Sequence, residues 1–193
     1  MAISLSKGQG INLAKTAPSL VRVRVGLGWD APELHSGYPF DIDVSAFICG
    51  LNAAGEPKLL SDEHLVFYNN LTSPNGAVVH SGDNRTGAGD GDDEVLTVDL
   101  ARLEAAAMEI SFVVTIHEAH SRGQNFGLVR NAAIRLYDDL SGTLIAGYQL
   151  GEAFGSETAV QFGSLFRSQG EWHFKAVGAG YRLGLADFVA GYQ

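Results

Sequence analysis

The chain has 193 residues, of which 46% are hydrophobic and 18% are charged, and its formal net charge is −9. This hydrophobic content is enough for one substantial core and excludes a disordered chain. The acidic balance argues against binding along nucleic acids, because their phosphate backbones repel a protein of this charge. Cys49 is the single cysteine, which excludes an internal disulfide.

The amino-terminal segment MAISLSKGQG lacks the apolar core of a signal peptide, and no run approaches the ~20 apolar residues of a membrane helix. We therefore expect a cytoplasmic protein whose membrane association, if any, is peripheral. No stretch is rich enough in Pro, Gly and Ser to act as a linker, so we expect residues 1–193 to form a single domain.

Alternating apolar and polar residues predict a succession of short strands. In chain order these strands are Leu20–Leu27, Phe40–Cys49, Leu65–Asn70, Ala77–His80, Val95–Val98, Met108–His117, Ala132–Tyr137, Leu144–Leu150, Ala159–Arg167 and Trp172–Val177. Short helices are predicted at Leu100–Ala107, capped by Asp99, and at Leu183–Ala190. The pattern predicts an all-β sandwich of two antiparallel sheets, with about ten strands and one or two short helices.

The second predicted strand places two aspartates on one face. Its apolar residues, from Phe40 to Ile48, share the other face, which suits a core. Asp41 and Asp43 lie about 7 Å apart along such a strand. Two like charges at this spacing are costly beside a third carboxylate unless a cation lies among them. Taken alone, the pair is better explained as a solvated strand face.

Turn-forming residues follow the third predicted strand. The pair Asn75-Gly76 is a strong hairpin signal, and the arm that starts at Ala77 leads directly into an acidic loop. Asn69 and Asn70 would supply neutral oxygens nearby. Turn formation is the simpler explanation of these two asparagines.

The acidic loop Gly82–Glu94, with the sequence GDNRTGAGDGDDE, is the most distinctive segment of the chain. It holds five carboxylates and four glycines in thirteen residues. Crowded carboxylates repel one another unless a cation sits among them, and Ca²⁺, with its flexible oxygen coordination, is the usual solution. Glycines allow the chain to fold its own carbonyl groups around one centre. The loop therefore predicts a calcium site.

The loop does not follow the EF-hand pattern. With Asp83 in position one, Glu94 falls on position twelve, where a bidentate Glu belongs. The residues at positions three, five and nine lack a carboxylate; they are Arg85, Gly87 and Gly91. The site must therefore have another architecture.

The end of the loop shows a period of two. If the segment is already extended there, Asp90, Asp92 and Glu94 point to one face and Asp93 points to the other. This arrangement would gather three carboxylates on one side of the chain.

Catalytic motifs are weak in this sequence. The histidines of His117-Glu118-Ala119-His120 are three apart, whereas the helical zinc-protease motif needs a spacing of four. The segment Gly26–Asp30 lacks the third glycine and the following helix of a dinucleotide loop. Cys49 has no neighbour in sequence that would lower its pKa, and we expect His80 on the surface or in a turn. The sequence therefore predicts a protein that is not an enzyme.

A set of short motifs spans nearly the whole chain. They are LSKG (Leu5–Gly8), VGLGWD (Val25–Asp30), FDIDVSAF (Phe40–Phe47), FYNN (Phe67–Asn70), the acidic loop, VVTIHEA (Val113–Ala119), NFG (Asn125–Gly127) and GEWHFKAVGAGY (Gly170–Tyr181). Together they resemble the TerD family of tellurium-resistance and stress-response proteins. The resemblance implies a bacterial β-sandwich that binds Ca²⁺, with two ions as our inference, and that responds to tellurite, phage and chemical stress. It also implies a cytoplasmic assembly with protein partners at the inner membrane.

The resemblance further implies a set of calcium ligands. Matched motif by motif, they are Asp30, Asp41, Asp43, Asn69, Asp83, Thr86, Gly87, Gly89, Asp90, Asp92 and Glu94, with the backbone contributing around residues 86–89. Ligation by this set reverses the simpler explanations given above for Asp41, Asp43 and Asn69.

Three functions remain open at this point. The favoured one is a calcium-dependent binding or scaffolding module in a stress response. The second is an enzyme or direct tellurite detoxifier, but oxyanion reduction needs thiols or a redox cofactor, and one cysteine without a cofactor motif argues against it. The third is a simple calcium buffer. The oligomeric state stays open.

Overall fold

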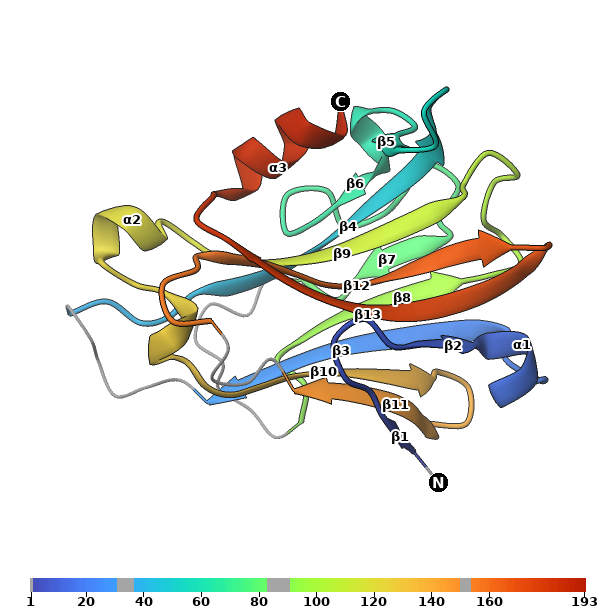
Figure 1. The fold of residues 1–193 in the computed structure, drawn as a ribbon, viewed down its shortest axis with the longest axis horizontal. Helices are drawn as coiled ribbons and strands as arrows, with labels where there is room; N and C mark the ends of the chain where they lie inside the picture. Colours follow the sequence, from blue (N-terminus) through green and yellow to red (C-terminus); the bar gives the residue numbers. More distant parts are fainter. Residues whose placement is uncertain (1, 31–36, 83–90, 150–153) are drawn as a thin grey trace.

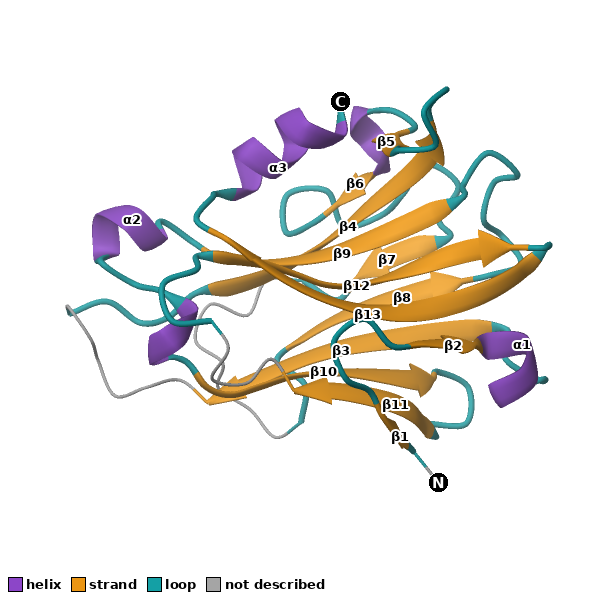
Figure 2. Ribbon diagram, in the orientation of Figure 1, coloured by secondary structure: helices purple, strands orange, loops and turns teal. Residues whose placement is uncertain are grey.

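The computed structural model describes residues 2–30, 37–82, 91–149 and 154–193. Strands dominate this part of the chain, and the short helices lie at its periphery (Figure 2). The helical segments are α1 (Leu13–Thr16), α2 (Ala119–Arg122), α3 (Leu185–Tyr192) and the 3₁₀ turns η1 (Asp62–His64) and η2 (Phe126–Leu128). No helix among the described residues has the length and apolar character needed to cross a membrane.

Two sheets form the body of the molecule (Figure 1). Sheet A has the order β1 (Ile3–Ser4), β11 (Leu144–Gln149), β10 (Arg130–Asp138), β3 (Arg22–Asp30), β8 (Glu94–Asp99) and β7 (Val78–His80). Sheet B has the order β2 (Gly10–Asn12), β13 (Glu171–Tyr181), β12 (Ala159–Ser168), β9 (Glu109–Ile116), β4 (Ile42–Leu51) and β5 (Pro57–Leu59), and β6 (Leu65–Val66) also pairs with β4. The predicted β-sandwich is confirmed.

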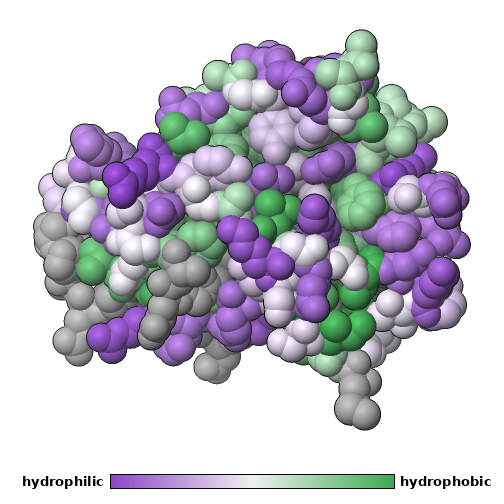
Figure 3. Space-filling model, in the orientation of Figure 1, coloured by the Kyte–Doolittle hydropathy of each residue, from purple (hydrophilic) through white to green (hydrophobic). Residues whose placement is uncertain are grey.

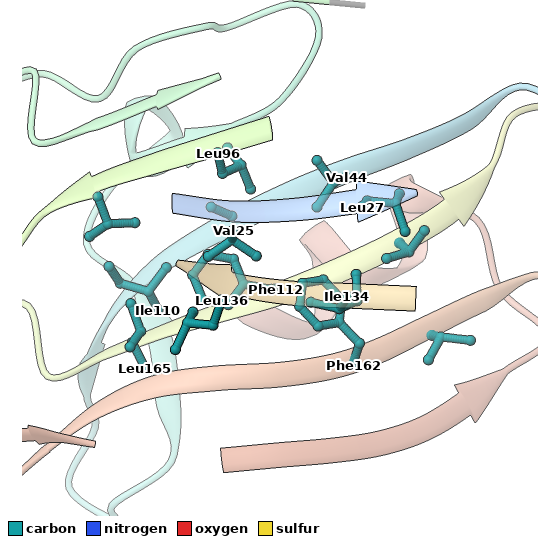
Figure 4. Packing of buried hydrophobic residues seen from close by; sticks show 14 of the residues in the cluster. Val25, Leu27, Val44, Leu96, Ile110, Phe112, Ile134, Leu136, Phe162 and Leu165 are labelled. Carbon is teal, nitrogen blue, oxygen red and sulfur yellow. The ribbon is translucent and has the colours of Figure 1, made fainter. Parts of the chain in front are cut away.

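The core lies between the two sheets (Figure 4). Alternate residues of β3, such as Val25 and Leu27, face the alternate residues of β9 and β12, where Phe112 and Phe162 stack with ring centroids 5.6 Å apart. The predicted alternation of β4 is confirmed, because its apolar face, from Phe40 to Ile48, belongs to this core. Burying such a face stabilises the fold by roughly 25 cal/mol per Å² of apolar surface.

A second apolar cluster covers the opposite face of sheet B under α3. Phe47 and Cys49 project from β4 into this cluster, where they meet Phe188 of α3, and the ring of Tyr192 stacks on Phe47 with centroids 4.7 Å apart. The predicted carboxy-terminal helix is therefore confirmed, with its bounds shifted by two residues.

The expected antiparallel pairing holds for the described strands with one exception, because β1 pairs in parallel with β11, with Ile3 opposite Ala146. One expectation about the elements is wrong. Residues 100–107 form turns instead of a helix. Asp99 does accept hydrogen bonds from the N–H groups of Ala101 and Arg102 as a cap would, but the segment must cross from sheet A to sheet B, and that requirement overrides helix propensity.

The predicted Asn75-Gly76 hairpin turn is confirmed, and a second hairpin joins β12 to β13. Thr72 bridges Val79 across the Asn75-Gly76 turn, where Gly76 has a φ of 65°. Ser168 pairs with Glu171 across a two-residue loop whose residues both have positive φ, the geometry that suits the twist of a hairpin.

Candidate metal centre

The predicted calcium ligands divide into two groups. Those within the acidic loop lie outside the described residues; they are Asp83, Thr86, Gly87, Gly89 and Asp90. The others are placed, and they are Asp30, Asp41, Asp43, Asn69, Asp92 and Glu94. The second group shows how the end of the loop is attached to the sandwich.

Asp92 lies on the outer face of sheet A, away from the core. Arg135 donates a hydrogen bond to its Oδ1 at 2.7 Å, and an Arg24 nitrogen lies 3.5 Å from its Oδ2. Its side chain is only 4% exposed, so the ion pairs are better shielded than ordinary surface pairs. Arg24 in turn lies over the ring of Tyr137, 4.0 Å from the centroid.

Two glycines in the VGLGWD motif make room for this aspartate. Val25, Leu27 and Trp29 face the core, so Gly26 and Gly28 face outward. A Cβ on Gly26 would collide with the Asp92 carboxylate, and one on Gly28 would lie 2.9 Å from the Arg135 guanidinium. The two glycines of the motif therefore leave space on the outer face of β3 for the side chains of Asp92 and Arg135.

Asp93 is held at the end of β3. Its N–H donates to the carbonyl oxygen of Leu27 at 2.7 Å, and its Oδ2 accepts the N–H of Trp29 at 3.0 Å. Burial raises the pKa of the Asp93 carboxyl, the Trp29 bond opposes this, and the nearby charges of Asp92 and Asp30 raise it further. Asp30 and Asp92 thus lie near enough to Asp93 for their charges to act on its carboxyl.

Glu94 points the other way, into the interior between the sheets. Its side chain is fully buried, and its Oε2 accepts the N–H of Val44 in sheet B at 2.6 Å. Val44 lies two residues before Ala46, which pairs with β6, so the backbone groups of both residues point to the same side of β4. Strand β6 ends before it reaches Val44, so the N–H and C=O of Val44 have no partner at that edge of β4 among the described strands. The Glu94 carboxylate therefore accepts a hydrogen bond from a buried backbone N–H of β4 and links β8 of sheet A to sheet B.

His80, at the other end of the acidic loop, completes the same edge. Its Nδ1 accepts the N–H of Gly82 at 3.0 Å, which places the ring proton on Nε2. Nε2 lies 3.2 Å from the carbonyl oxygen of Val44 and 3.5 Å from Glu94 Oε2. The expectation of a surface position for His80 is wrong, because the residue is 3% exposed and binds Val44 from the opposite sheet.

The expected common face for Asp92 and Glu94 is wrong as well. Strand β8 begins only at Glu94, so the alternation does not extend to Asp92. Asp92 points to the outer face of sheet A, Asp93 to the end of β3, and Glu94 to the interior. The carboxylates of these three successive residues therefore bind three different parts of the sandwich: Arg135 on β10, Trp29 on β3 and Val44 on β4.

The remaining predicted ligands lie around sheet B and its neighbouring turns. Asp41 and Asp43 are 5% and 4% exposed, and they alternate with core residues, so their side chains leave β4 on the face opposite the core. Asn69 is exposed in a tight turn between Phe67 and Asn70. The Asn70 side chain holds this turn by donating to the carbonyl oxygen of Leu65 at 2.7 Å, which confirms turn chemistry for that asparagine.

The placed residues do not form one metal site by themselves. Packed sheets are about 10 Å apart, so Asp92 outside sheet A and Asp43 outside sheet B cannot bind the same ion. In the ranges 2–30, 37–82, 91–149 and 154–193, no three His, Cys, Asp or Glu side chains are grouped closely enough to hold a metal. The calcium ligand set, including its members in residues 83–90, remains a prediction.

Sequence reasoning missed the basic partners of the loop. Arg24 and Arg135 show no motif of their own, although both stand at the polar positions of alternating strands. The sequence did not indicate that His80 is buried, because the residue that it contacts, Val44, lies in the other sheet.

The fold and the motifs agree with the comparisons to known proteins. The TerD domain family matches residues 1–192. The chain belongs to the TerD family. It is 50% identical to the tellurium resistance protein TerD of Serratia marcescens and 49% identical to general stress protein 16U of Bacillus subtilis (strain 168), covering 100% of this chain and 97% of each relative.

A solved structure supports the same assignment. The homologue of the telluride resistance protein TerD from Streptomyces coelicolor A3(2) superposes with a TM-score of 0.71 at 25% identity, covering 89% of this chain and 96% of that one.

Proposed function

We propose that this TerD-family protein is a calcium-dependent binding or scaffolding module of a bacterial stress response of the tellurite-resistance type. It acts by recruiting protein partners in the cytoplasm, peripheral to the inner membrane, without catalysis of its own. The names of its relatives, which refer to tellurium resistance and general stress, support the biological setting.

One observation carries the calcium part of the proposal. The two ends of the acidic loop are fixed to both sheets, by His80 and Glu94 at Val44 and by Asp92 at Arg135. Beside the end of the loop, burial raises the pKa of the Asp93 carboxyl, and repulsion by the negative charges of Asp92 and Asp30 raises it further. A divalent cation would relieve that repulsion.

The chemistry of the donors fits a hard cation. The placed candidates, Asp30, Asp41, Asp43 and Asn69, offer carboxylate or amide oxygens, as Ca²⁺ prefers. His80 is engaged by Gly82 and Val44, so a nitrogen ligand of the kind that zinc favours is not supplied from this position. The ion would neutralise the loop and fix its shape for a partner.

The two alternatives predict different behaviour. A direct tellurite detoxifier would need a reactive thiol, yet burial raises the pKa of Cys49 to about 12, which disfavours its thiolate. A simple buffer would bind calcium with little change in stability or partner binding.

Calorimetric titration of chelator-stripped protein with Ca²⁺ and then Mg²⁺ tests the proposal. We expect a calcium Kd of about 10⁻⁷ M or tighter and weak competition by Mg²⁺. At 1 mM Ca²⁺ such a site would raise the free energy of unfolding by about 5 kcal/mol, which a melting curve would register.

The result also separates the alternatives. Partner capture from a bacterial lysate that depends on Ca²⁺ would exclude the buffer, and tellurite turnover that depends on Cys49 would favour the detoxifier. Absence of calcium binding would refute the proposed function.

A further inference from the structure

A cavity of about 600 Å³ opens on the outer face of sheet B. Its floor comes from β4 and β9, and its walls come from α2, from residues 156–158 and from the segment that leads into α3. In Figure 3, which shares the orientation of Figure 1, hydrophilic residues predominate around α2 at the upper left. The volume falls within the range of small-molecule sites.

The floor of the cavity is built by the pairing of β4 with β9. Asp43 lies opposite Thr115, and the N–H of His117 donates to the carbonyl oxygen of Asp41 at 2.8 Å, which extends the pairing by one step. Asp43 and His117 are therefore diagonal neighbours on the same face. Asp43 is 4% exposed, so its carboxylate lies at the bottom of the cavity.

Two aromatic rings form a corner in this cavity. The rings of Tyr68 and His117 both line it, with centroids 6.4 Å apart and planes at 83°. The face of a tyrosine ring attracts cations, and a carboxylate beside that ring adds a charge attraction for an ammonium group.

The wall next to His117 has a constrained backbone. Glu118 adopts a left-handed conformation with a φ of 51°, which turns the chain from β9 into α2. Such a conformation costs about 1 kcal/mol or more in a residue other than glycine. The surrounding contacts must therefore hold this wall in place.

The carboxylates of the lining outnumber its guanidinium. The cavity is lined by the carboxylates of Asp43, Glu118 and Asp187, the guanidinium of Arg182, and the imidazoles of His117 and His120. The rim charges are held by neighbours: Asp187 accepts the N–H of Gly184 at 2.9 Å, Glu118 pairs with Arg122 at 2.9 Å, and Arg182 donates to Ser156 Oγ. The net charge of −9 adds a long-range attraction for cations.

We propose that this cavity binds a small aliphatic diamine or polyamine. One ammonium group binds Asp43 in the corner formed by Tyr68 and His117. The methylene chain runs along the apolar part of the wall, supplied by Leu183 and Leu185. The other ammonium group reaches the carboxylates at the rim.

Calorimetric titration with cadaverine and with spermidine, at 150 mM NaCl in excess EDTA, tests this site. The chelator keeps Ca²⁺ away from Asp43, so the result does not depend on the calcium proposal. We expect saturable binding with one ligand per chain, and no binding of 1,5-pentanediol, which has the same length without the charges. Asp43→Asn should weaken diamine binding at least about tenfold, which corresponds to about 1.4 kcal/mol.

Matched variants distinguish the site from general attraction to an acidic protein. Glu63→Gln removes the same charge from an exposed position outside the cavity and should bind as the wild type does. Tyr68→Leu keeps bulk but removes the ring face, and it should weaken binding severalfold even if Asp43→Asn fails to fold. No saturable binding, an equal loss in Glu63→Gln, or unchanged affinity in Tyr68→Leu would each overturn the proposal.

Discussion

At the scale of single residues, the space that Gly26 leaves for Asp92 can be tested by adding a methyl group at this glycine. Gly26→Ala places a Cβ where the Asp92 carboxylate lies, so the carboxylate must leave Arg135 and Arg24. We expect a loss of about 1–3 kcal/mol in the free energy of unfolding, measured by urea denaturation. Gly191→Ala is the control, because a Cβ there meets nothing within 4 Å and alanine favours the helix. Wild-type stability in Gly26→Ala would contradict the described packing of the Asp92 carboxylate against Gly26.

Glu94 allows its structural role to be separated from metal binding. Glu94→Ala leaves the buried N–H of Val44 without its acceptor and should cost about 1–3 kcal/mol of unfolding free energy. Glu94→Gln keeps an acceptor oxygen and should stay closer to the wild type when both are measured in EDTA. If Glu94 also binds calcium, the Gln variant will show weaker Ca²⁺ affinity in calorimetry. Equal destabilisation of the two variants would show that charge, rather than the hydrogen bond, matters at this position.

At the scale of elements, α3 packs on the outer face of sheet B and shields Cys49. Phe188 is 7% exposed and packs beside Cys49 and Phe47. We expect Phe188→Ala to lower the free energy of unfolding by about 3 kcal/mol or more and to speed the reaction of Cys49 with a thiol reagent such as DTNB. Leu183→Ala, at a position that is 40% exposed, is the control and should leave both quantities nearly unchanged. A Cys49 that reacts equally fast in all three proteins would show that α3 does not shield it.

The same elements show what sequence could predict. Alternation located the long strands, because a half-buried strand repeats every two residues wherever its partner lies. It missed β1, β2 and β5, which have two or three residues each and are too short to show a period. It also misplaced Asp92 relative to Glu94, since the chain becomes extended only at Glu94. Sequence located the acidic loop, whereas Arg135, Arg24 and Val44 were identified only once the sheets had been assembled.

At the scale of the whole molecule, stability should fall in alkaline solution. Burial raises the pKa of Cys49 from 9.0 to about 12 and that of Tyr192 from 10.0 to about 12. The unfolded chain therefore loses these protons first, so unfolding releases protons and becomes easier as the pH rises from about 9 towards 12. Urea denaturation between pH 8 and pH 11 should show this decline, and a Cys49→Ala, Tyr192→Phe double variant should show a shallower one. The same slope in both proteins would mean that other groups cause it.

The edges of the two sheets have a consequence for how the protein is made. The earliest strands pair with late ones: β1 lies beside β11, and β2 lies beside β13, where Ile11 is opposite Phe174. During translation, β2 has no partner until residues 173–175 have left the ribosome, so sheet B cannot be completed before β13 is made, whereas sheet A needs the chain only through β11. Such long sequence separations slow folding, into the millisecond-to-second range typical of β-sandwiches. Under stress, a newly made copy would therefore become functional only after β13 has been made.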